Sequence, residues 1–393
     1  MVPQPPIYLD HAAATPLDPE VAAAIAAAQG AAFGNPSSQH AAGRAAKRLL
    51  EESRERILAA LGGVTTGPTR NRLIFTSGAS EANYLGIVGM AAAAGTGRIA
   101  FSRREHPSAI GAAQAAGGRG WQGEELPLDA HLGTARAAAL AAIEERDRGR
   151  GIREPWIVCL TLICGQTGSL EQRDWLPDCR DRGILVHVDA TQAAGWMPLD
   201  FHASAAATLA LAPHKFGGPR GIGGLIVRDD VAVQAVQAGP QEQGLRGGTE
   251  AVPLVAGFAR AVELAVADRA AAARVGAVRD RFEALLLAAA AAAGQPAQVI
   301  AAGGPRAPHL SAIAFPGLDR QSLAIAADLA GVAIATGTAC ASGSSEPAPA
   351  LVAMGLPPEV VRGAVRFSFG RTTTVEEVDR AVKRLAPLLE RRK

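Results

Sequence analysis

The pattern of apolar and polar positions shows two kinds of run that alternate along the chain. Short runs rich in β-branched residues are followed by longer runs of helical composition. The first such pair predicts a strand at 72–76 and a helix at 80–94. Further strands and helices are predicted, in chain order, at 98–102, 107–116, 156–163, 175–182, 184–188, 208–210 and 223–227. Strands that alternate with crossover helices are typical of a parallel sheet. The sequence therefore predicts an α/β fold.

The two ends of the chain differ from this repeat. Asp18 and the proline after it precede an alanine-rich run to Gly30, which predicts a capped helix, and a second helix is expected at 38–61. A long helix is expected from about 252 to 293. Strands and helices then alternate again, at 309–315, 320–330, 364–369 and 375–389. This second series predicts a smaller α+β domain, and we place the boundary near Val255.

Composition and charge narrow the class of protein. The chain has 393 residues, 48% of them hydrophobic, and a net charge of +2 from 39 basic and 37 acidic residues. Charges this closely balanced favour neither nucleic acid nor a membrane surface, so the expected partner is a small molecule or another protein. The longest apolar run, 284–293, is too short to cross a membrane, and the N-terminal residues lack the features of a signal peptide. We therefore expect a cytoplasmic protein.

The four cysteines, Cys159, Cys164, Cys179 and Cys340, have neither the density of a disulfide scaffold nor the spacing of a zinc site. We expect reduced thiols and no metal. The first three lie in or next to apolar segments and are expected to be inert packing residues. Cys340 differs because its neighbours are small residues, which suit a mobile loop that carries a thiol into a site and out again.

Asp189 and Lys215 are the first pair that suggests chemistry. Asp189 lies at the end of an apolar strand, where open α/β sheets bind ligands. Lys215 lies among small residues between apolar strands, where loss of water would lower the pKa of its amine and favour a Schiff base with an aldehyde. Pyridoxal 5'-phosphate (PLP) requires such an amine together with an anion for its ring nitrogen. Each residue alone is weak evidence, so the prediction depends on the combination.

Two further features could complete such a site. Residues 76–81 lead from a strand through small residues into a helix, and the free N–H groups of such a turn could bind a phosphate. The same residues could equally form an ordinary capping box with Ser77 or Ser80 as the cap. His106 follows the next strand and could stack on a planar ring, although an isolated histidine is more often structural.

A set of short motifs resembles the cysteine desulfurases of the class V aminotransferase fold. They are Tyr8-Leu9-Asp10 with Ala14-Thr15-Pro16, Phe33 to Ser38, Phe75 to Glu81, Glu105-His106, His187 to Gln192, His214-Lys215, Arg246 to Thr249, Gly337 to Cys340 and Arg366 to Arg371. The resemblance implies the type I fold of PLP-dependent transferases. Its large PLP-binding domain, 16–255, would contain a mixed, mostly parallel seven-stranded sheet. The small domain, 1–15 and 256–393, would carry the mobile cysteine loop.

The resemblance also implies roles for the reacting residues. Lys215 would bind PLP covalently and later move protons between the substrate carbons. His106 would stack on the cofactor ring and assist proton transfer. Arg366, helped by Asn35, would bind the carboxylate of L-cysteine. Cys340 would attack the substrate sulfur, which leaves alanine and a protein persulfide.

Other residues would hold the cofactor, again by resemblance. Asp189 would pair with the ring nitrogen and Gln192 would hydrogen-bond the phenolic oxygen. The phosphate would be held by Gly78, Ala79, Ser80, His214 and, from the second subunit of a homodimer, Thr249. The sulfur acceptor would be a scaffold or carrier protein in iron–sulfur cluster assembly or another sulfur-transfer pathway.

Two positions depart from the family pattern. Relatives usually carry an Asn-Asn-Glu-type stretch at 164–166, and Gly165 cannot supply the hydrogen bond that the second Asn makes to the phenolic oxygen. Ala212 replaces a serine that often contacts the phosphate. A lost hydrogen bond costs about 1 kcal/mol, so we expect weaker cofactor binding or altered reactivity unless Gln166 or Cys164 compensates.

Three hypotheses follow from these residues. The first is a working cysteine desulfurase. The second is a selenocysteine lyase or another PLP-dependent lyase or aminotransferase on the same fold. The third is a partner-binding protein whose PLP site has degenerated.

Overall fold

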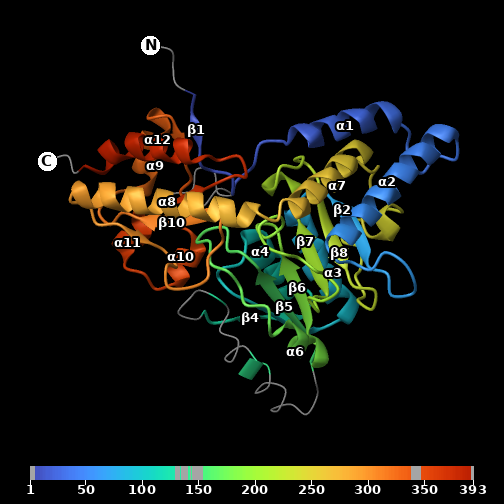
Figure 1. Cartoon of the computed structure of the whole chain (residues 1–393). Coiled ribbons are helices and arrows are strands. Elements are labelled where there is room, and N and C mark those ends of the chain that lie inside the picture. The colour runs from blue at the N-terminus through green and yellow to red at the C-terminus, as the bar shows by residue number, and fades with distance from the viewer. Residues whose placement is uncertain are drawn as a thin grey trace.

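A seven-stranded sheet forms the centre of the larger part of the molecule (Figure 1). The structure is a computed structural model and describes residues 5–128, 133, 140, 141, 143, 154–337 and 347–390. The strand order is β2 (Arg72–Thr76), β8 (Gly223–Val227), β7 (Thr208–Leu211), β6 (Leu185–Asp189), β5 (Trp156–Thr161), β3 (Gly97–Phe101) and β4 (Trp121–Glu125). β8 runs antiparallel to both neighbours, and the other pairs are parallel. The predicted mixed, mostly parallel seven-stranded sheet is confirmed.

Helices cover both faces of this sheet because both faces of its strands are apolar. In β2, Leu73 and Phe75 belong to one core and Ile74 to the other, as the period of two along a strand requires. The first core also takes residues from α1 (Pro19–Ala31), α2 (Ala41–Ala60) and α7 (Val252–Ala267), and the second from α3 (Ala79–Ala94) and α4 (Pro107–Gly117). A short helix, α6 (Leu176–Asp181), contacts β6. The carboxyl ends of the parallel strands thus lie between two helical layers.

The structure corrects the expected long helix at 252–293, because α7 ends at Ala267 and a second helix, α8 (Ala271–Ala292), follows. Arg371 donates from Nη2 to the carbonyl of Ala265 at 3.1 Å, and in a continuous helix that carbonyl would accept from the N–H four residues later. Asp268 adopts a non-helical conformation. No glycine or proline marks this break, so periodicity alone did not indicate it.

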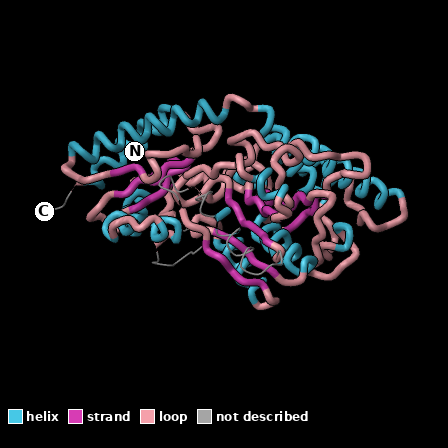
Figure 2. The backbone as a smooth tube through the Cα atoms, turned by 90° about the horizontal axis from the view of Figure 1, so that it is seen from below, coloured by secondary structure: helices cyan, strands magenta, loops and turns pink. Residues whose placement is uncertain are grey.

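The smaller part contains a three-stranded antiparallel sheet, separate from the large one (Figure 2). Its order is β12 (Ala364–Ser368), β10 (Leu310–Ala314) and β9 (Gln298–Val299). Its other elements are α9 (Arg320–Leu329), α10 (Pro349–Ala353), α11 (Pro358–Arg362), α12 (Val375–Leu385) and the 3-10 helix η3 (Ala386–Leu389). The first strand, β1 (Ile7–Tyr8), pairs with β11 (Val332–Ala333), which brings the start of the chain to this part. The exact boundaries between the large and the small domain, after residues 15 and 255, stay a prediction.

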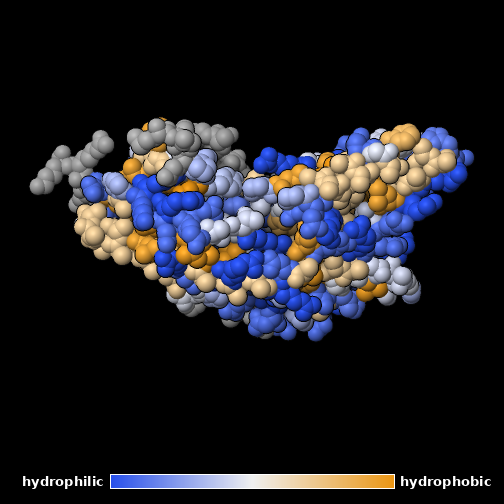
Figure 3. Space-filling view, turned by 45° about the horizontal axis from the view of Figure 1, so that its top comes forward, coloured by the Kyte–Doolittle hydropathy of each residue, from blue (hydrophilic) through white to orange (hydrophobic). Residues whose placement is uncertain are grey.

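Polar and apolar residues are interspersed on the molecular face in Figure 3. The most exposed large apolar side chains are Phe33 (74%), after α1, and Ile325 (63%) and Leu329 (84%), one turn apart on α9. Within the described ranges, no helix combines the length and apolarity needed to span a bilayer.

Candidate active site

Lys215 and Gln192 meet at one backbone carbonyl near the carboxyl edge of the large sheet. Lys215 ends the 3-10 helix η1 (Pro213–Lys215), which follows β7, and Gln192 follows β6. Nζ of Lys215 donates to the carbonyl oxygens of Ala12 at 2.7 Å and Ala13 at 2.9 Å. Nε2 of Gln192 donates to the same Ala12 oxygen at 2.8 Å. The N-terminal segment therefore holds two predicted site residues side by side.

Asp189 ends β6 as predicted, and donors reach both of its carboxylate oxygens. The residue is 4% exposed. Oδ2 accepts from Nδ2 of Asn83 at 2.8 Å, and Oδ1 accepts from the backbone N–H of Thr191 at 2.9 Å. Two donors to a buried carboxylate fix its orientation. This group can therefore offer a fixed negative charge to a cationic ring nitrogen.

The amino end of α3 has no side-chain cap. Gly78 occupies the cap position in an extended conformation, so the possible capping box with Ser77 or Ser80 as cap is not formed. A Cβ on Gly223 would lie 2.4 Å from the carbonyl carbon of Gly78, whereas a Cβ on Gly78 itself would meet no protein atom within 4 Å. Uncapped N–H groups beside open space at a helix start suit a phosphate.

Three more residues, Ala79, Ser80 and His214, are predicted phosphate ligands. Ala79 is half-buried and Ser80 is exposed, and both lie in the first turn of α3. His214 is half-buried just before Lys215. Burial lowers the pKa of His214 to about 4, with smaller contributions from the positive charges of Lys215 and Arg220. His214 is therefore neutral at pH 7 and can donate or accept a hydrogen bond.

His106 is the cap residue of α4. Its Nδ1 accepts from the backbone N–H of Ser108 at 3.1 Å and lies 2.7 Å from the Ser108 hydroxyl oxygen. These contacts make Nδ1 an acceptor, so a neutral His106 carries its proton on Nε2. The preceding Glu105 is buried, and burial raises its pKa to about 7.

Arg366 lies in β12 of the smaller sheet and reaches back toward the large one. Its Nη1 donates to the carbonyl of Gly165 at 2.9 Å and its Nη2 to the Asp10 carboxylate at 2.8 Å. Arg366 is 4% exposed, and its buried Nε has no hydrogen-bond partner among the described residues. An unsatisfied buried donor on a guanidinium suits a further anionic ligand.

The structure also shows the surroundings of residues 164–166, where the sequence departs from the family pattern. A Cβ at Gly165 would lie 3.5 Å from Nε2 of Gln192, so a longer side chain there would face that glutamine. Gln166 accepts from the backbone N–H of Ala350 at 2.9 Å, and Cys164 is completely buried. The Gln166 oxygen is therefore occupied by α10.

Asn35, Thr249 and Cys340 are not joined to this cluster by the contacts of the described residues. Asn35 is exposed, and its side chain accepts from the N–H of Ser37 within its own turn. Thr249 is exposed as well. Cys340 lies outside the described residues. The other three cysteines are buried, and burial raises the pKa of Cys159 well above its usual value.

Sequence reasoning missed two groups that the structure adds. Asn83, in α3, contacts Asp189, and only its polar character next to the apolar residues that follow in α3 could have indicated it. His309 lies with Nε2 3.3 Å from Oε1 of Gln192 and stacks on Trp196 with ring centroids 4.4 Å apart. Burial, with smaller contributions from His11 and positively charged side chains nearby, lowers the pKa of His309 to about 3.

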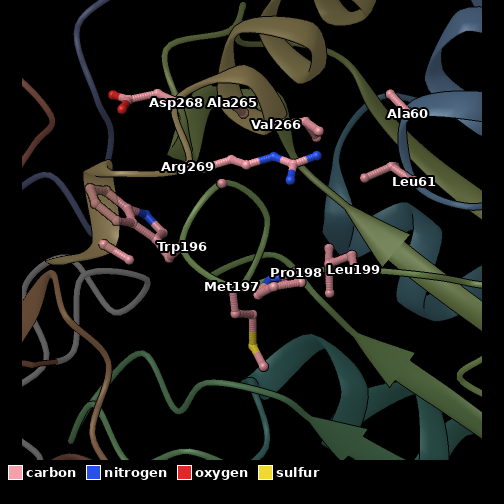
Figure 4. Close-up of a pocket in the computed structure, with 12 residues that line it drawn as sticks. Ala60, Leu61, Trp196, Met197, Pro198, Leu199, Ala265, Val266, Asp268 and Arg269 are labelled. Atoms are coloured by element: carbon pink, nitrogen blue, oxygen red, sulfur yellow. The ribbon is translucent and has the colours of Figure 1, made fainter.

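Trp196 also lines a separate pocket of about 400 Å³ (Figure 4). Its walls come from the end of α2, the segment 195–199 and the break between α7 and α8. None of the predicted site residues lines it. This pocket is therefore a neighbour of the site, connected to Gln192 through Trp196 and His309.

The arrangement fits PLP. Asp189 supplies an oriented carboxylate for the ring nitrogen, Lys215 supplies an amine beside Gln192, and the uncapped start of α3 supplies donors for a phosphate. No group of three or more histidine, cysteine or acidic side chains placed to hold a metal ion occurs in the described parts of the chain.

Comparisons with known proteins identify the family of this chain. The family model for aminotransferase class-V matches residues 7–381. A cysteine desulfurase of Cereibacter sphaeroides is 33% identical over 98% of this chain and 96% of its own length, and a cysteine desulfurase IscS 1 of Archaeoglobus fulgidus is 32% identical over 98% and 97%. The structure of a NifS-like protein from Rickettsia africae superposes with a TM-score of 0.84 at 24% identity, covering 96% of this chain and 98% of that one. The chain belongs to the aminotransferase class-V family and, within it, to the PLP-dependent cysteine desulfurases.

Proposed function

We propose that this protein converts L-cysteine to L-alanine and transfers the sulfur to its own Cys340 as a persulfide. The observations that support this most directly are the Ala12 carbonyl shared by Lys215 and Gln192 and, three residues before Gln192 in the chain, the Asp189 carboxylate held by two donors. PLP, when bound, supplies the electron sink that makes the bonds of the substrate reactive.

Protein residues supply binding and proton transfer in this proposal. Arg366 binds the substrate carboxylate, with its unsatisfied Nε as the free donor. Lys215 moves a proton between the substrate carbons, and His106 donates from Nε2 because Nδ1 is occupied. Asn35 would help Arg366, although among the described residues its side chain bonds only the backbone N–H of Ser37.

The sulfur step balances without an added oxidant or reductant. The Cys340 thiolate attacks the sulfur of bound cysteine, an S–S bond forms, and the C–S bond breaks. The released carbon takes a proton, which gives alanine and an enzyme persulfide. A scaffold or carrier protein then accepts the sulfur, for iron–sulfur cluster assembly or another sulfur-transfer pathway.

The test combines a spectrum with one substitution. The purified protein should be yellow, its absorption should change on addition of L-cysteine, and it should release alanine. Cys340→Ser should abolish persulfide transfer, while Cys179→Ser, at a buried thiol in α6, should retain it. Turnover that survives Cys340→Ser would favour a selenocysteine lyase or another lyase, and a colourless protein that takes up no PLP would favour a degenerate binding protein.

We further infer a cytoplasmic homodimer in which Thr249 contributes to the phosphate site of the other subunit. The exposure of Thr249 in the single chain supports this inference. Mixed dimers provide the test: two inactive variants, Lys215→Ala and Thr249→Asp, should restore activity when co-expressed, since one of the two sites then has both native residues. Recovery no higher than that of either parent would argue against a shared site.

A further inference from the structure

A chain of buried hydrogen bonds runs behind Asp189, away from the side that would face a cofactor. Asn83 is at its centre and is completely buried. Its Nδ2 lies 2.8 Å from Oδ2 of Asp189 and 2.9 Å from Oγ of Ser108, and its Oδ1 lies 3.0 Å from Nε2 of His187. His187 in turn has Nδ1 2.8 Å from Oγ1 of Thr208. Every polar atom of the Asn83 amide thus has a partner.

The ionised carboxylate fixes the direction of every bond in this chain. An ionised Asp189 can only accept, so the Asn83 amide must present its NH₂ group to it. The amide oxygen of Asn83 then faces His187, whose Nε2 must carry a hydrogen. A neutral imidazole has only one N–H, so Nδ1 of His187 accepts from the Thr208 hydroxyl.

Packing holds His187 in this role. The residue is 0% exposed in the centre of the large sheet. A Cβ on Gly86, one helical turn after Asn83, would lie 2.6 Å from Nδ1 of His187, so this glycine allows α3 to lie against the imidazole. Burial lowers the pKa of His187 to about 4, although the negative charge of Asp189 acts in the opposite direction. The imidazole ring is therefore neutral at pH 7.

We propose that Asn83 is a positioning residue for Asp189 and that His187 fixes the Asn83 amide with its NH₂ group toward the carboxylate. Without an N–H on Nε2 of His187, the amide could turn and place its oxygen against the carboxylate, where two acceptors would repel each other. The catalytic consequence rests on the proposed function, because it assumes that Asp189 pairs with the ring nitrogen of PLP. The geometric claim does not.

The tautomer of His187 tests the geometric claim directly. Long-range ¹H–¹⁵N correlation spectra of the full-length protein, labelled at its histidine nitrogens, should show His187 neutral at pH 7 with its hydrogen on Nε2. A hydrogen on Nδ1 would mean that the amide presents its oxygen to Asp189, and it would overturn the proposal. Neither result depends on cysteine turnover.

Substitution of Asn83 tests the consequence for the site. Asn83→Leu keeps a similar volume but removes a hydrogen bond to a charged group, so the Kd for PLP should rise about tenfold or more. The pH at which the bound cofactor loses its ring proton, followed by absorption, should fall. Asn71→Leu is the matched control: Asn71 is also buried, but its side chain bonds only the backbone of Val64 among the described residues, so its loss should lower stability and leave both readouts unchanged.

A second pair of variants covers the case in which Asn83→Leu does not fold. His187→Gln retains an N–H donor for Asn83, whereas His187→Leu removes it. The Kd for PLP should stay within about threefold of wild type in His187→Gln. It should rise in His187→Leu, because the Asn83 amide is then no longer held in one orientation. Equal affinities in the two variants would overturn the proposal. If PLP binds as expected but cysteine is not turned over, the proposed function fails while this inference stands.

Discussion

The proposed cofactor side and the proposed substrate side of the site are built in different ways. On the cofactor side, Asp189, Asn83 and His187 come from one sheet and the helix packed on it, and their hydrogen bonds are complete in the chain alone. On the substrate side, Arg366 is in the smaller sheet, Asp10 follows the first strand and Gly165 follows β5. These three residues are far apart in the sequence.

The two sides also differ in what they leave unsatisfied. Both oxygens of Asp189 already accept hydrogen bonds, whereas the buried Nε of Arg366 has no partner among the described residues. We infer that the cofactor side is arranged before any ligand binds and that the substrate side gains its last contact from the substrate. A charge that is already in place lowers the activation free energy, because no group has to reorient during the reaction. A contact that forms only when the substrate arrives mainly affects substrate binding.

Loss of the lysine amine is the largest change that the cofactor side can suffer. In Lys215→Ala, neither a covalent link to PLP nor proton transfer by the amine remains, so kcat should fall by about 10³-fold or more. Steady-state alanine formation measures kcat, and the absorption spectrum shows whether the covalent link is lost. An active Lys215→Ala enzyme would remove the basis for calling this the cofactor side.

Arg366→Lys probes the substrate side alone. Lysine keeps the charge but loses the fork that reaches Gly165 and Asp10 at once, so KM for L-cysteine should rise about 10- to 100-fold. The Kd for PLP should change by less than about threefold, because the cofactor contacts are elsewhere. A rise in the PLP Kd as large as the rise in KM would show that the two sides are not separable.

This comparison also explains what the sequence could predict. The strands and helices of the large sheet, and the place of Asp189 at the end of β6, follow from local apolar periodicity and were predicted. The edge strand β4 was missed because its residues, Trp-Gln-Gly-Glu-Glu, are mostly polar. The break between α7 and α8 was missed because no glycine or proline marks it and Arg371, which bonds the Ala265 carbonyl there, is remote in the sequence.

The site shows the same limit at the level of single residues. The surroundings of Lys215 and the motif resemblance of Gln192 identified these two residues, but the Ala12 carbonyl that joins them is a backbone atom and leaves no trace in the residue type. Asn83 lies in an alanine-rich helix and matched no pattern of catalytic residues. Contacts between distant segments require the fold, so periodicity and motifs alone could not supply them.

Acid should lower the stability of the folded protein. Burial lowers the pKa of His187, His214 and His11 to about 4 and that of His309 to about 3. Each stays neutral in the fold while the unfolded chain takes up a proton below its usual value near 6.5. Their contribution to stability is therefore complete above about pH 6.5 and is lost progressively as the pH falls toward 4.

One group opposes this trend, and urea unfolding can measure the balance. Burial raises the pKa of Glu105 to about 7, so Glu105 favours the folded state as the pH falls from 7 toward its unfolded value. Because four histidines outweigh one carboxyl, the free energy of unfolding should fall by roughly 5 kcal/mol between pH 7 and pH 5. His309→Gln should flatten this dependence, and an unchanged slope would mean that His309 is not held neutral by the fold.

Gly165→Asn should produce the smallest effect and sharpen the comparison, because position 165 touches both sides. Its carbonyl accepts from Arg366, while a side chain there would face Gln192 on the cofactor side. Gly165 does not have a positive φ and a Cβ would make only ordinary contact at 3.5 Å, so the backbone can accept a larger residue. The asparagine restores the side chain that relatives usually carry, and one added hydrogen bond should lower the Kd for PLP about fivefold.

Gly165→Ala is the matched control, since it adds the Cβ without the amide and should leave the Kd for PLP within about twofold of wild type. KM for L-cysteine should stay the same in both variants, because the backbone carbonyl that Arg366 uses is retained. If the asparagine raised KM and left the Kd for PLP unchanged, position 165 would belong to the substrate side, and the missing asparagine would not explain weak cofactor binding.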